Sequence, residues 1–245
     1  MKTNSVLIGI FLIGSLASSG AGFEKSKIKG SSGRDLAYFL LKPVATEAGK
    51  KHPLVLALHG AGGRKAKDWV KNCYANKMLS SVTMRKKYPC YVVAPNVTGK
   101  DNWTGDRLAD VFELVGQLQK KFPIDADRIY VTGQSMGGYG TFAAIVSRPK
   151  FFAAAVPVCG GNRPANAKAI AKVPIWVFHG EKDTTVPVAR SREMVDALRK
   201  ASGTPKYTEF PRVGHGAWTP AYDKGELWKW MFAQRKGNEN LEINR

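Results

Sequence analysis

Short apolar runs recur along the chain, each bounded by glycine, proline or charged residues. They are too short for buried helices, and several are rich in Val, Ile and aromatic residues, which predicts buried β-strands. We expect strands at residues 36–41, 53–58, 90–94, 128–132, 153–158 and 174–179, and a more polar one at 207–210. The first of these suits an edge strand, while 53–58 and 90–94 suit the centre of a sheet.

Segments with helical spacing lie between these runs. In residues 106–121 and 188–201, apolar residues recur with the spacing of an amphipathic helix. Residues 136–147 are small and apolar, as in a buried helix, and we expect a last helix near 225–232. Strands that alternate with helices predict a mostly parallel central sheet with helices on both faces. With 245 residues, 44% of them hydrophobic, and no repeat or internal linker, we expect one catalytic domain at residues 23–234.

The two ends of the chain differ from this pattern. Residues 1–22 carry an early lysine, a short apolar run and then small residues, which is typical of a secretory signal peptide. No cysteine follows the apolar run, so we expect a secreted or periplasmic protein without a stable membrane anchor. Residues 235–245 form a polar C-terminal tail that we expect to fray, together with Gln234.

A glycine-rich turn follows the predicted strand 128–132. Here Gly133-x-Ser135-x-Gly137 stands between that strand and the predicted helix 136–147. A strand, a sharp turn and a helix are what a nucleophile elbow requires, because the turn exposes the serine hydroxyl. The alternative is an ordinary glycine-rich turn or a phosphate loop, but Gly138 stands where a phosphate loop needs lysine.

A serine nucleophile needs a base and an orienting acid, which follow it in the order acid then histidine in α/β-hydrolases. Of the four histidines, His179 and His215 follow Ser135. His179 ends an apolar strand and suits a structural role, whereas His215 lies in a glycine-flanked loop. Asp183 comes just beyond strand 174–179, at the edge where parallel sheets carry their sites, and Glu181 is the second candidate.

An oxyanion hole completes this chemistry. It consists of backbone N–H groups, each worth about 3 to 4 kcal/mol to the transition state. Met136 follows the nucleophile directly and supplies one donor. The glycine-rich loop after strand 53–58 supplies the other, from Ala61 or, as second choice, from Gly62.

The segments LVLALHGAGG, DRIYVTGQSMGGYGTF, VPIWVFHGEKDTTVPV and VGHGAWTPAY carry a family resemblance. The chain resembles secreted α/β-hydrolases of the carboxylesterase, dienelactone hydrolase and phospholipase type, a group of predicted peptidases similar to the catalytic domain of prolyl oligopeptidase. The resemblance covers about residues 36–232. It implies Ser135 as nucleophile, Asp183 as orienting acid and His215 as base, with Ala61 and Met136 as the oxyanion hole.

The remaining composition narrows the function. Cys73, Cys90 and Cys159 are an odd number with no metal-ligand spacing, which favours buried thiols over a metal site, and we expect no cofactor. Lys and Arg total 38 against 19 Asp and Glu, a net charge of +19. These basic residues are dispersed, with no basic helix, so we expect a solvated cationic face, suited to steering toward an acidic polymer, rather than nucleic-acid binding.

The sequence thus predicts a serine esterase. An esterase is favoured over a peptidase because 245 residues leave no room for the propeller of oligopeptidases. The segment 159–173 is too short for a multi-helix lid, so we expect an open site. Trp103 and Trp218 lie near the chemistry, either packing their own loops or contacting substrate. We expect short-chain or aryl esters, including acetyl or feruloyl groups on polysaccharide. A polyester depolymerase and a non-catalytic binding protein on this scaffold are the remaining alternatives.

Overall fold

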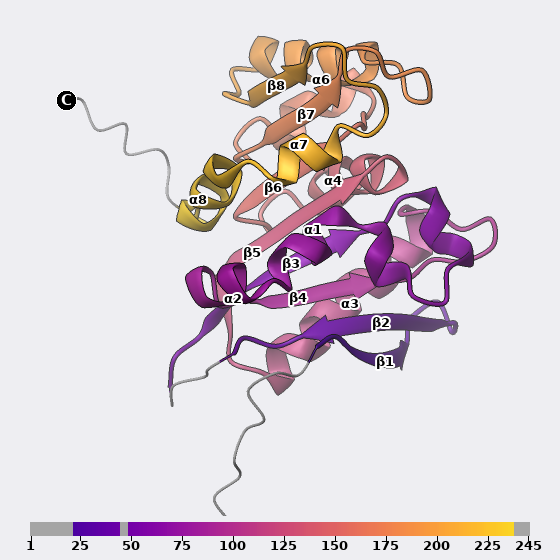
Figure 1. Cartoon of the computed structure of the whole chain (residues 1–245), viewed down its shortest axis with the longest axis vertical. Coiled ribbons are helices and arrows are strands. Elements are labelled where there is room, and N and C mark those ends of the chain that lie inside the picture. The colour runs from indigo at the N-terminus through magenta and orange to yellow at the C-terminus, as the bar shows by residue number, and fades with distance from the viewer. Residues whose placement is uncertain (1–21, 45–48, 238–245) are drawn as a thin grey trace, which may run out of the picture.

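The computed structural model describes residues 22–44 and 49–237 (Figure 1). The predicted signal peptide up to residue 21 and residues 238–245 of the predicted tail lie outside them. A sheet of eight strands, in the spatial order β1-β2-β4-β3-β5-β6-β7-β8, runs through the molecule. Its strands are β1 (Glu24–Lys29), β2 (Asp35–Leu41), β3 (His52–Leu58), β4 (Tyr91–Pro95), β5 (Ile124–Gln134), β6 (Ala154–Val158), β7 (Trp176–Gly180) and β8 (Lys206–Phe210).

The sheet is mixed but mostly parallel. Strand β2 pairs antiparallel with both β1 and β4, and all other neighbouring strands pair in parallel. Parallel strands need crossover connections, and the helices that make them cover the two faces of the sheet. The predicted α/β-hydrolase fold is confirmed.

Helices are found on both sides of the sheet (Figure 1). The α-helices are α1 (Tyr74–Leu79), α2 (Val82–Lys87), α3 (Gly105–Lys121), α4 (Met136–Ser147), α5 (Ala167–Ile170), α6 (Ala189–Lys200), α7 (Trp218–Tyr222) and α8 (Gly225–Ala233). Side chains on β3 alternate between two cores. Leu54 and Leu56 belong to the core that includes α3, α4 and α6, whereas Val55 and Ala57 belong to the core that includes α1, α7 and α8.

Helix α4 packs closely against its neighbours because glycine stands at the positions of contact. A methyl group at Gly138 would overlap the carbonyl oxygen of Val158 on β6, and one at Gly140 would overlap the Trp103 side chain. This close approach fixes the start of α4, and hence Ser135, against the carboxyl end of the sheet.

The structure corrects the prediction at the edge of the sheet. Residues 36–41 do form a strand, β2, but it is not at the edge, because β1 pairs outside it. Strand β1 has the sequence EKSKIK, and all its side chains but that of Ile28 are exposed. A strand with two solvated faces has no apolar alternation, and the sequence pattern therefore gave no sign of it.

The predicted fraying does not hold for Gln234–Lys236. The Tyr130 hydroxyl donates to the carbonyl oxygen of Gln234 at 2.9 Å. The backbone N–H of Lys236 donates to the carbonyl oxygen of Asp127, also at 2.9 Å. These bonds hold the end of the described chain against β5.

Residues 159–173 contain only a short 3₁₀ helix, η3 (Pro164–Asn166), and α5, so they form no multi-helix lid. Within residues 22–44 and 49–237, none of the helices has both the length and the hydropathy needed to cross a membrane.

Candidate active site

Ser135 lies at a sharp turn between β5 and α4. Its backbone adopts φ +56° and ψ −120°, a conformation that costs an ordinary L-residue free energy and persists only where the surroundings impose it. The surroundings here are close backbone contacts on both sides. A methyl group at Gly133 or Gly137 would overlap the carbonyl oxygen of Leu58 on β3. The two glycines therefore permit the turn, as the Gly-x-Ser-x-Gly pattern predicts.

Three predicted residues, far apart in the sequence, meet at this turn. Asp183 follows β7 and His215 follows β8, so both lie at the carboxyl edge of the sheet, where β5 delivers Ser135. His215 Nε2 lies 2.9 Å from Ser135 Oγ, and His215 Nδ1 lies 2.7 Å from Asp183 Oδ2. An acceptor at Nδ1 holds the imidazole with a proton on that nitrogen, which leaves Nε2 free to accept the serine proton.

The Asp183 carboxylate is buried and held from two sides. Its Oδ1 accepts hydrogen bonds from the backbone N–H groups of Thr185 and Val186, each at 2.9 Å, while Oδ2 faces His215. Burial opposes ionisation of the carboxyl group, but the hydrogen bonds from His215 and the two N–H groups outweigh this and lower the pKa of Asp183 below its ordinary value. Asp183 is therefore a fixed negative charge beside the imidazole.

Glu181, the second candidate for the orienting acid, has other partners. Its carboxylate accepts the backbone N–H of Arg212 at 2.8 Å and lies 4.0 Å from the Lys182 amine. It makes no hydrogen bond with His215 in the described residues. The structure thus brings Asp183, and not Glu181, to the base.

His179 contacts the same carboxylate, which the sequence pattern did not indicate. Its Nε2 lies 3.2 Å from Asp183 Oδ2 and 2.9 Å from the carbonyl oxygen of Val186, and its Nδ1 lies 2.7 Å from Ser191 Oγ. Burial lowers the pKa of His179, so the neutral ring is favoured. The only sequence signal for this contact was the spacing His179-Gly180-x-x-Asp183, which spans the end of β7 and the turn after it.

The two predicted oxyanion-hole residues each begin a helix. Ala61 is the first residue of the 3₁₀ helix η1 (Ala61–Lys65), and Met136 is the first residue of α4. The N–H of a first helical residue has no partner within its helix and is therefore available to a ligand. Gly60 packs beside the nucleophile, since a methyl group built there would lie 3.6 Å from Ser135 Cβ. Gly62 is the second residue of η1, one position further along.

Buried His59 fixes the loop that carries Ala61. Its Nε2 accepts the backbone N–H of Val97 at 3.3 Å, so its Nδ1 carries the proton and donates to the carbonyl oxygen of Gly60 at 2.7 Å. Burial lowers the pKa of His59, which keeps the ring neutral and this tautomer in place. The His59 side chain therefore ties the loop after β3 to the segment that follows β4.

The two tryptophans take different positions. Trp218 is half-buried, and its ring meets the His215 ring edge-on, with centroids 5.1 Å apart. Trp103 is only 1% exposed, and its indole N–H donates to the carbonyl oxygen of His59 at 3.0 Å. Trp103 also forms part of the wall of a 440 Å³ pocket, together with Met136 and the exposed Tyr139. Trp218 thus packs against the residue that contacts Ser135, and Trp103 packs against α4, the helix that follows Ser135.

The three cysteines are buried free thiols. Among the described residues, the donor atoms of Cys159, His179 and Asp183 lie within 4.8 Å of one another and form a possible metal-ligand group. However, burial raises the pKa of Cys159 to about 12, which keeps the thiol protonated, and a metal binds the thiolate. The Asp183 carboxylate in this group is already hydrogen-bonded to His215 and to two backbone N–H groups. This arrangement fits a hydrogen-bonded network around an ionised carboxylate better than a metal site.

Comparison with known proteins identifies the family and the fold of this chain. The sequence model of the prolyl oligopeptidase family (peptidase S9) matches residues 96–163 and 161–236. The crystal structure of a thermostable esterase superposes with a TM-score of 0.81 and 34% sequence identity, covering 87% of this chain and 63% of that one.

Two curated proteins are more distant in sequence. A bifunctional acetylxylan esterase/xylanase of Neocallimastix patriciarum is 27% identical over 220 residues, which cover 84% of this chain and 31% of that protein. A probable feruloyl esterase C of Aspergillus flavus is 27% identical over 173 residues, covering 69% and 63%. The chain thus spans less than two thirds of the length of each of these three proteins.

The family match extends over more than half of the chain and contains Ser135, Asp183 and His215. This protein therefore belongs to the prolyl oligopeptidase family of serine hydrolases, which have the α/β-hydrolase fold.

Proposed function

We propose that this protein is a serine esterase and that Ser135, His215 and Asp183 are its catalytic triad. The observation that carries the proposal is the continuous hydrogen-bonded chain from Ser135 Oγ through the His215 imidazole to the Asp183 carboxylate, at 2.9 and 2.7 Å. A serine hydroxyl is a weak nucleophile until a base accepts its proton, and this chain supplies that base in the required tautomer.

The reaction follows from these positions. Ser135 Oγ attacks the ester carbonyl carbon while His215 Nε2 takes the hydroxyl proton, and negative charge develops on the carbonyl oxygen. The N–H groups of Ala61 and Met136 donate to that oxygen. When the tetrahedral intermediate collapses, His215 returns the proton to the departing alcohol. A water molecule, deprotonated by the same nitrogen, then hydrolyses the acyl-enzyme and restores Ser135.

The acyl group is proposed to occupy the 440 Å³ pocket beside Met136. Its lining includes Trp103, Tyr139 and Arg64. The exposed Tyr139 ring can pack against a planar aryl group. Similarity to an acetylxylan esterase and a feruloyl esterase supports the same substrate class. We therefore propose acetyl or aryl esters carried on a polysaccharide as substrates.

Trp218 is proposed to orient the base. Its ring packs edge-on against His215, and it restricts the rotation that would carry Nε2 away from Ser135. No cofactor enters any of these steps, since serine, histidine and backbone N–H groups account for each proton and charge.

The direct test is hydrolysis of p-nitrophenyl acetate by the wild type and by Ser135→Ala. We expect a loss of about 10⁴-fold or more in kcat for Ser135→Ala. Ser147→Ala, at the exposed end of α4, is the matched control and retains wild-type rates. Equal activity in the wild type and Ser135→Ala would refute the proposal, and inactivity of the wild type on every ester would favour a binding protein.

Substrate selectivity is tested by a panel of acetate, butyrate, feruloyl and long-chain esters, together with a set of peptide substrates. Membership of the prolyl oligopeptidase family favours peptidase activity as the second candidate. We expect kcat/KM to be highest for the acetate or feruloyl ester, and Tyr139→Ala to lower it most for the feruloyl ester. An optimum at long acyl chains with activation at an oil interface, or faster peptide cleavage, would contradict the assignment.

A further inference from the structure

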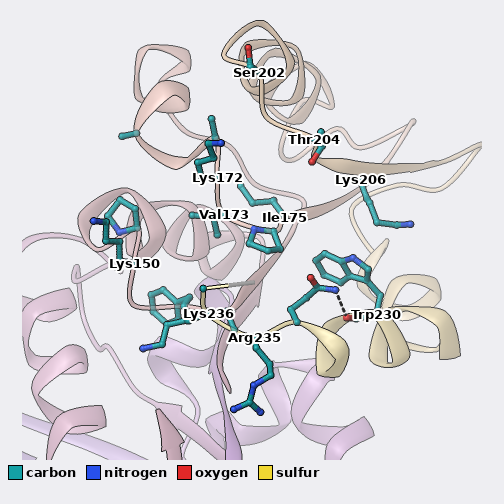
Figure 2. A pocket seen from close by; sticks show the side chains of 18 residues that line it. Lys150, Lys172, Val173, Ile175, Ser202, Thr204, Lys206, Trp230, Arg235 and Lys236 are labelled. Atoms are coloured by element: carbon teal, nitrogen blue, oxygen red, sulfur yellow. Dashed lines mark hydrogen bonds between the residues drawn. The ribbon is translucent and has the colours of Figure 1, made fainter. Parts of the chain in front are cut away.

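A second cavity, of about 780 Å³, is lined by the residues drawn in Figure 2. It lies at the edge of the sheet where β6, β7 and β8 begin, opposite the edge that carries Ser135. Its walls come from the segments that lead into β6, β7 and β8 and from the residues that follow α8. We call it the rear groove. Strand β7 is five residues long, so the groove and the carboxyl edge that carries Asp183 are about 16 Å apart along the sheet. The groove is therefore separate from the catalytic chemistry.

The charged residues that line the rear groove are all basic. Lys150, Lys172, Lys206, Arg235 and Lys236 line it, and no aspartate or glutamate does. The four lysines form no ion pair within the part of the chain that the structure describes. Arg235 is the exception, since it lies 3.2 Å from Asp125. Several basic residues that line one cavity, with no acidic residue in the lining, favour an anionic ligand.

The groove also carries an aromatic surface. Trp230 on α8 is half-buried, and its ring is held edge-on to Trp176, with centroids 5.5 Å apart. Lys206 Nζ lies 4.6 Å from the Trp176 ring centroid, so the cation and the aromatic pair belong to one cluster. Figure 2 shows the hydroxyl groups of Ser202 and Thr204 above the Trp230 ring in this view. A ring face, hydroxyl groups and cations together suit a sugar that carries an acidic group.

We propose that the rear groove binds a segment of an anionic polysaccharide, with its carboxylate or sulfate groups paired with Lys172 and Lys206 and a sugar ring against Trp230. This inference rests on the proposed function only in assigning the ligand to a polysaccharide; the binding itself requires no catalysis. A polymer held there stays close to the enzyme while its ester groups reach Ser135 from a different strand or segment, which raises their effective concentration.

A single-stranded nucleic acid has the same charge, but it fits the groove less well. Proteins that bind single strands stack successive bases on several aromatic side chains. In the rear groove the lining includes one tryptophan with an accessible ring, Trp230, whereas Phe152 is buried. The polysaccharide is therefore the ligand that we infer, and nucleic acid serves as a competitor in the test.

The test measures binding of polygalacturonate by isothermal titration calorimetry, on a Ser135→Ala background. The groove variant is Lys172→Gln with Lys206→Gln, both at exposed positions. The control variant is Lys29→Gln with Lys120→Gln, also exposed, on β1 and α3, which lowers the net charge equally. We expect the groove variant to bind about tenfold more weakly and the control within about twofold of the parent. A neutral glucan of equal length should not bind.

Equal weakening by the two double variants would reduce the binding to general charge attraction and overturn the proposal. Equal or tighter binding of a single-stranded oligonucleotide, or no polygalacturonate binding at all, would do the same. Hydrolysis of p-nitrophenyl acetate by the two double variants with Ser135 intact is measured separately. Full hydrolysis by the wild type, together with no polygalacturonate binding by the Ser135→Ala parent whose groove is intact, refutes the groove alone, whereas binding by that parent without hydrolysis by the wild type refutes the esterase proposal alone.

Discussion

His179 and His215 both contact the Asp183 carboxylate, but only His215 reaches the serine. We expect His215→Ala to lower kcat by about 10⁴-fold or more, because no other group then accepts the Ser135 proton. His179→Ala should retain most activity, since it removes one neighbour of a carboxylate that is still held by two backbone N–H groups. Steady-state kinetics with p-nitrophenyl acetate decides between them.

The control for both histidine variants is Asp196→Asn, on the solvent-exposed side of α6. It should have wild-type kinetics. If His179 proved essential and His215 dispensable, the assignment of the base would be wrong.

Two buried histidines, His59 and His179, predict how stability depends on pH. Burial lowers the pKa of both, whereas in the unfolded chain both titrate at about 6.5. Below that pH the unfolded state takes up protons that the folded state does not, so the free energy of unfolding decreases as the pH falls. We expect the thermal unfolding midpoint to decrease from pH 7.5 to pH 5.5, and less steeply in His179→Asn. A midpoint that increases toward acid pH would contradict this.

At the scale of elements, the contact between α4 and β3 sets the position of the nucleophile. A methyl group at Gly137 would overlap the Leu58 carbonyl oxygen, so Gly137→Ala forces the helix away from the strand. We expect a loss of about 2 kcal/mol or more in the free energy of unfolding, measured with urea, together with lower activity.

Gly116 in α3 offers a matched control, because a methyl group there meets no atom within 4 Å. Gly116→Ala should therefore raise the free energy of unfolding by about 0.5 to 1 kcal/mol. Destabilisation by both changes to the same extent would show that the contact with Leu58 is not the cause.

Elements with a buried apolar pattern could be predicted from the sequence, and elements without one could not. The runs that became β3, β4, β5, β6 and β7 are nearly continuous apolar segments, and each was placed within a few residues. In contrast, β1 has two solvated faces, and α1, α2 and α7 are shorter than two turns, so none has a hydrophobic period to detect.

The candidate site shows the same division. Ser135, Asp183 and His215 could be proposed because each stands at a strand end in a recognisable order. The contact of His179 with Asp183, the pairing of Trp218 with His215 and the packing of Trp103 against Gly140 depend on how loops return to the sheet. Sequence spacing does not specify those tertiary contacts, and the rear groove, built from four separate segments, is a further example.

At the scale of the whole molecule, we propose export, because residues 1–22 have the early lysine, short apolar run and small residues of a secretory signal peptide. Cleavage there would leave every strand of the described sheet intact. We expect the exported protein to have its N-terminus between about Ala17 and Phe23, as mass spectrometry of the periplasmic or extracellular fraction would show. Intact Met1 in that fraction would contradict the prediction.

The outermost strand of the sheet has a consequence for how the protein behaves at high concentration. Among the described residues, one side of the β1 backbone has no strand partner, and such an edge is a template for the addition of strands from other chains. Lys25, Lys27 and Lys29 alternate along it, with only Ile28 partly buried between them. Two copies that approach edge to edge would bring these three ammonium groups of each chain together. The polar sequence that hid β1 from prediction therefore disfavours growth of the sheet at this one of its two edges.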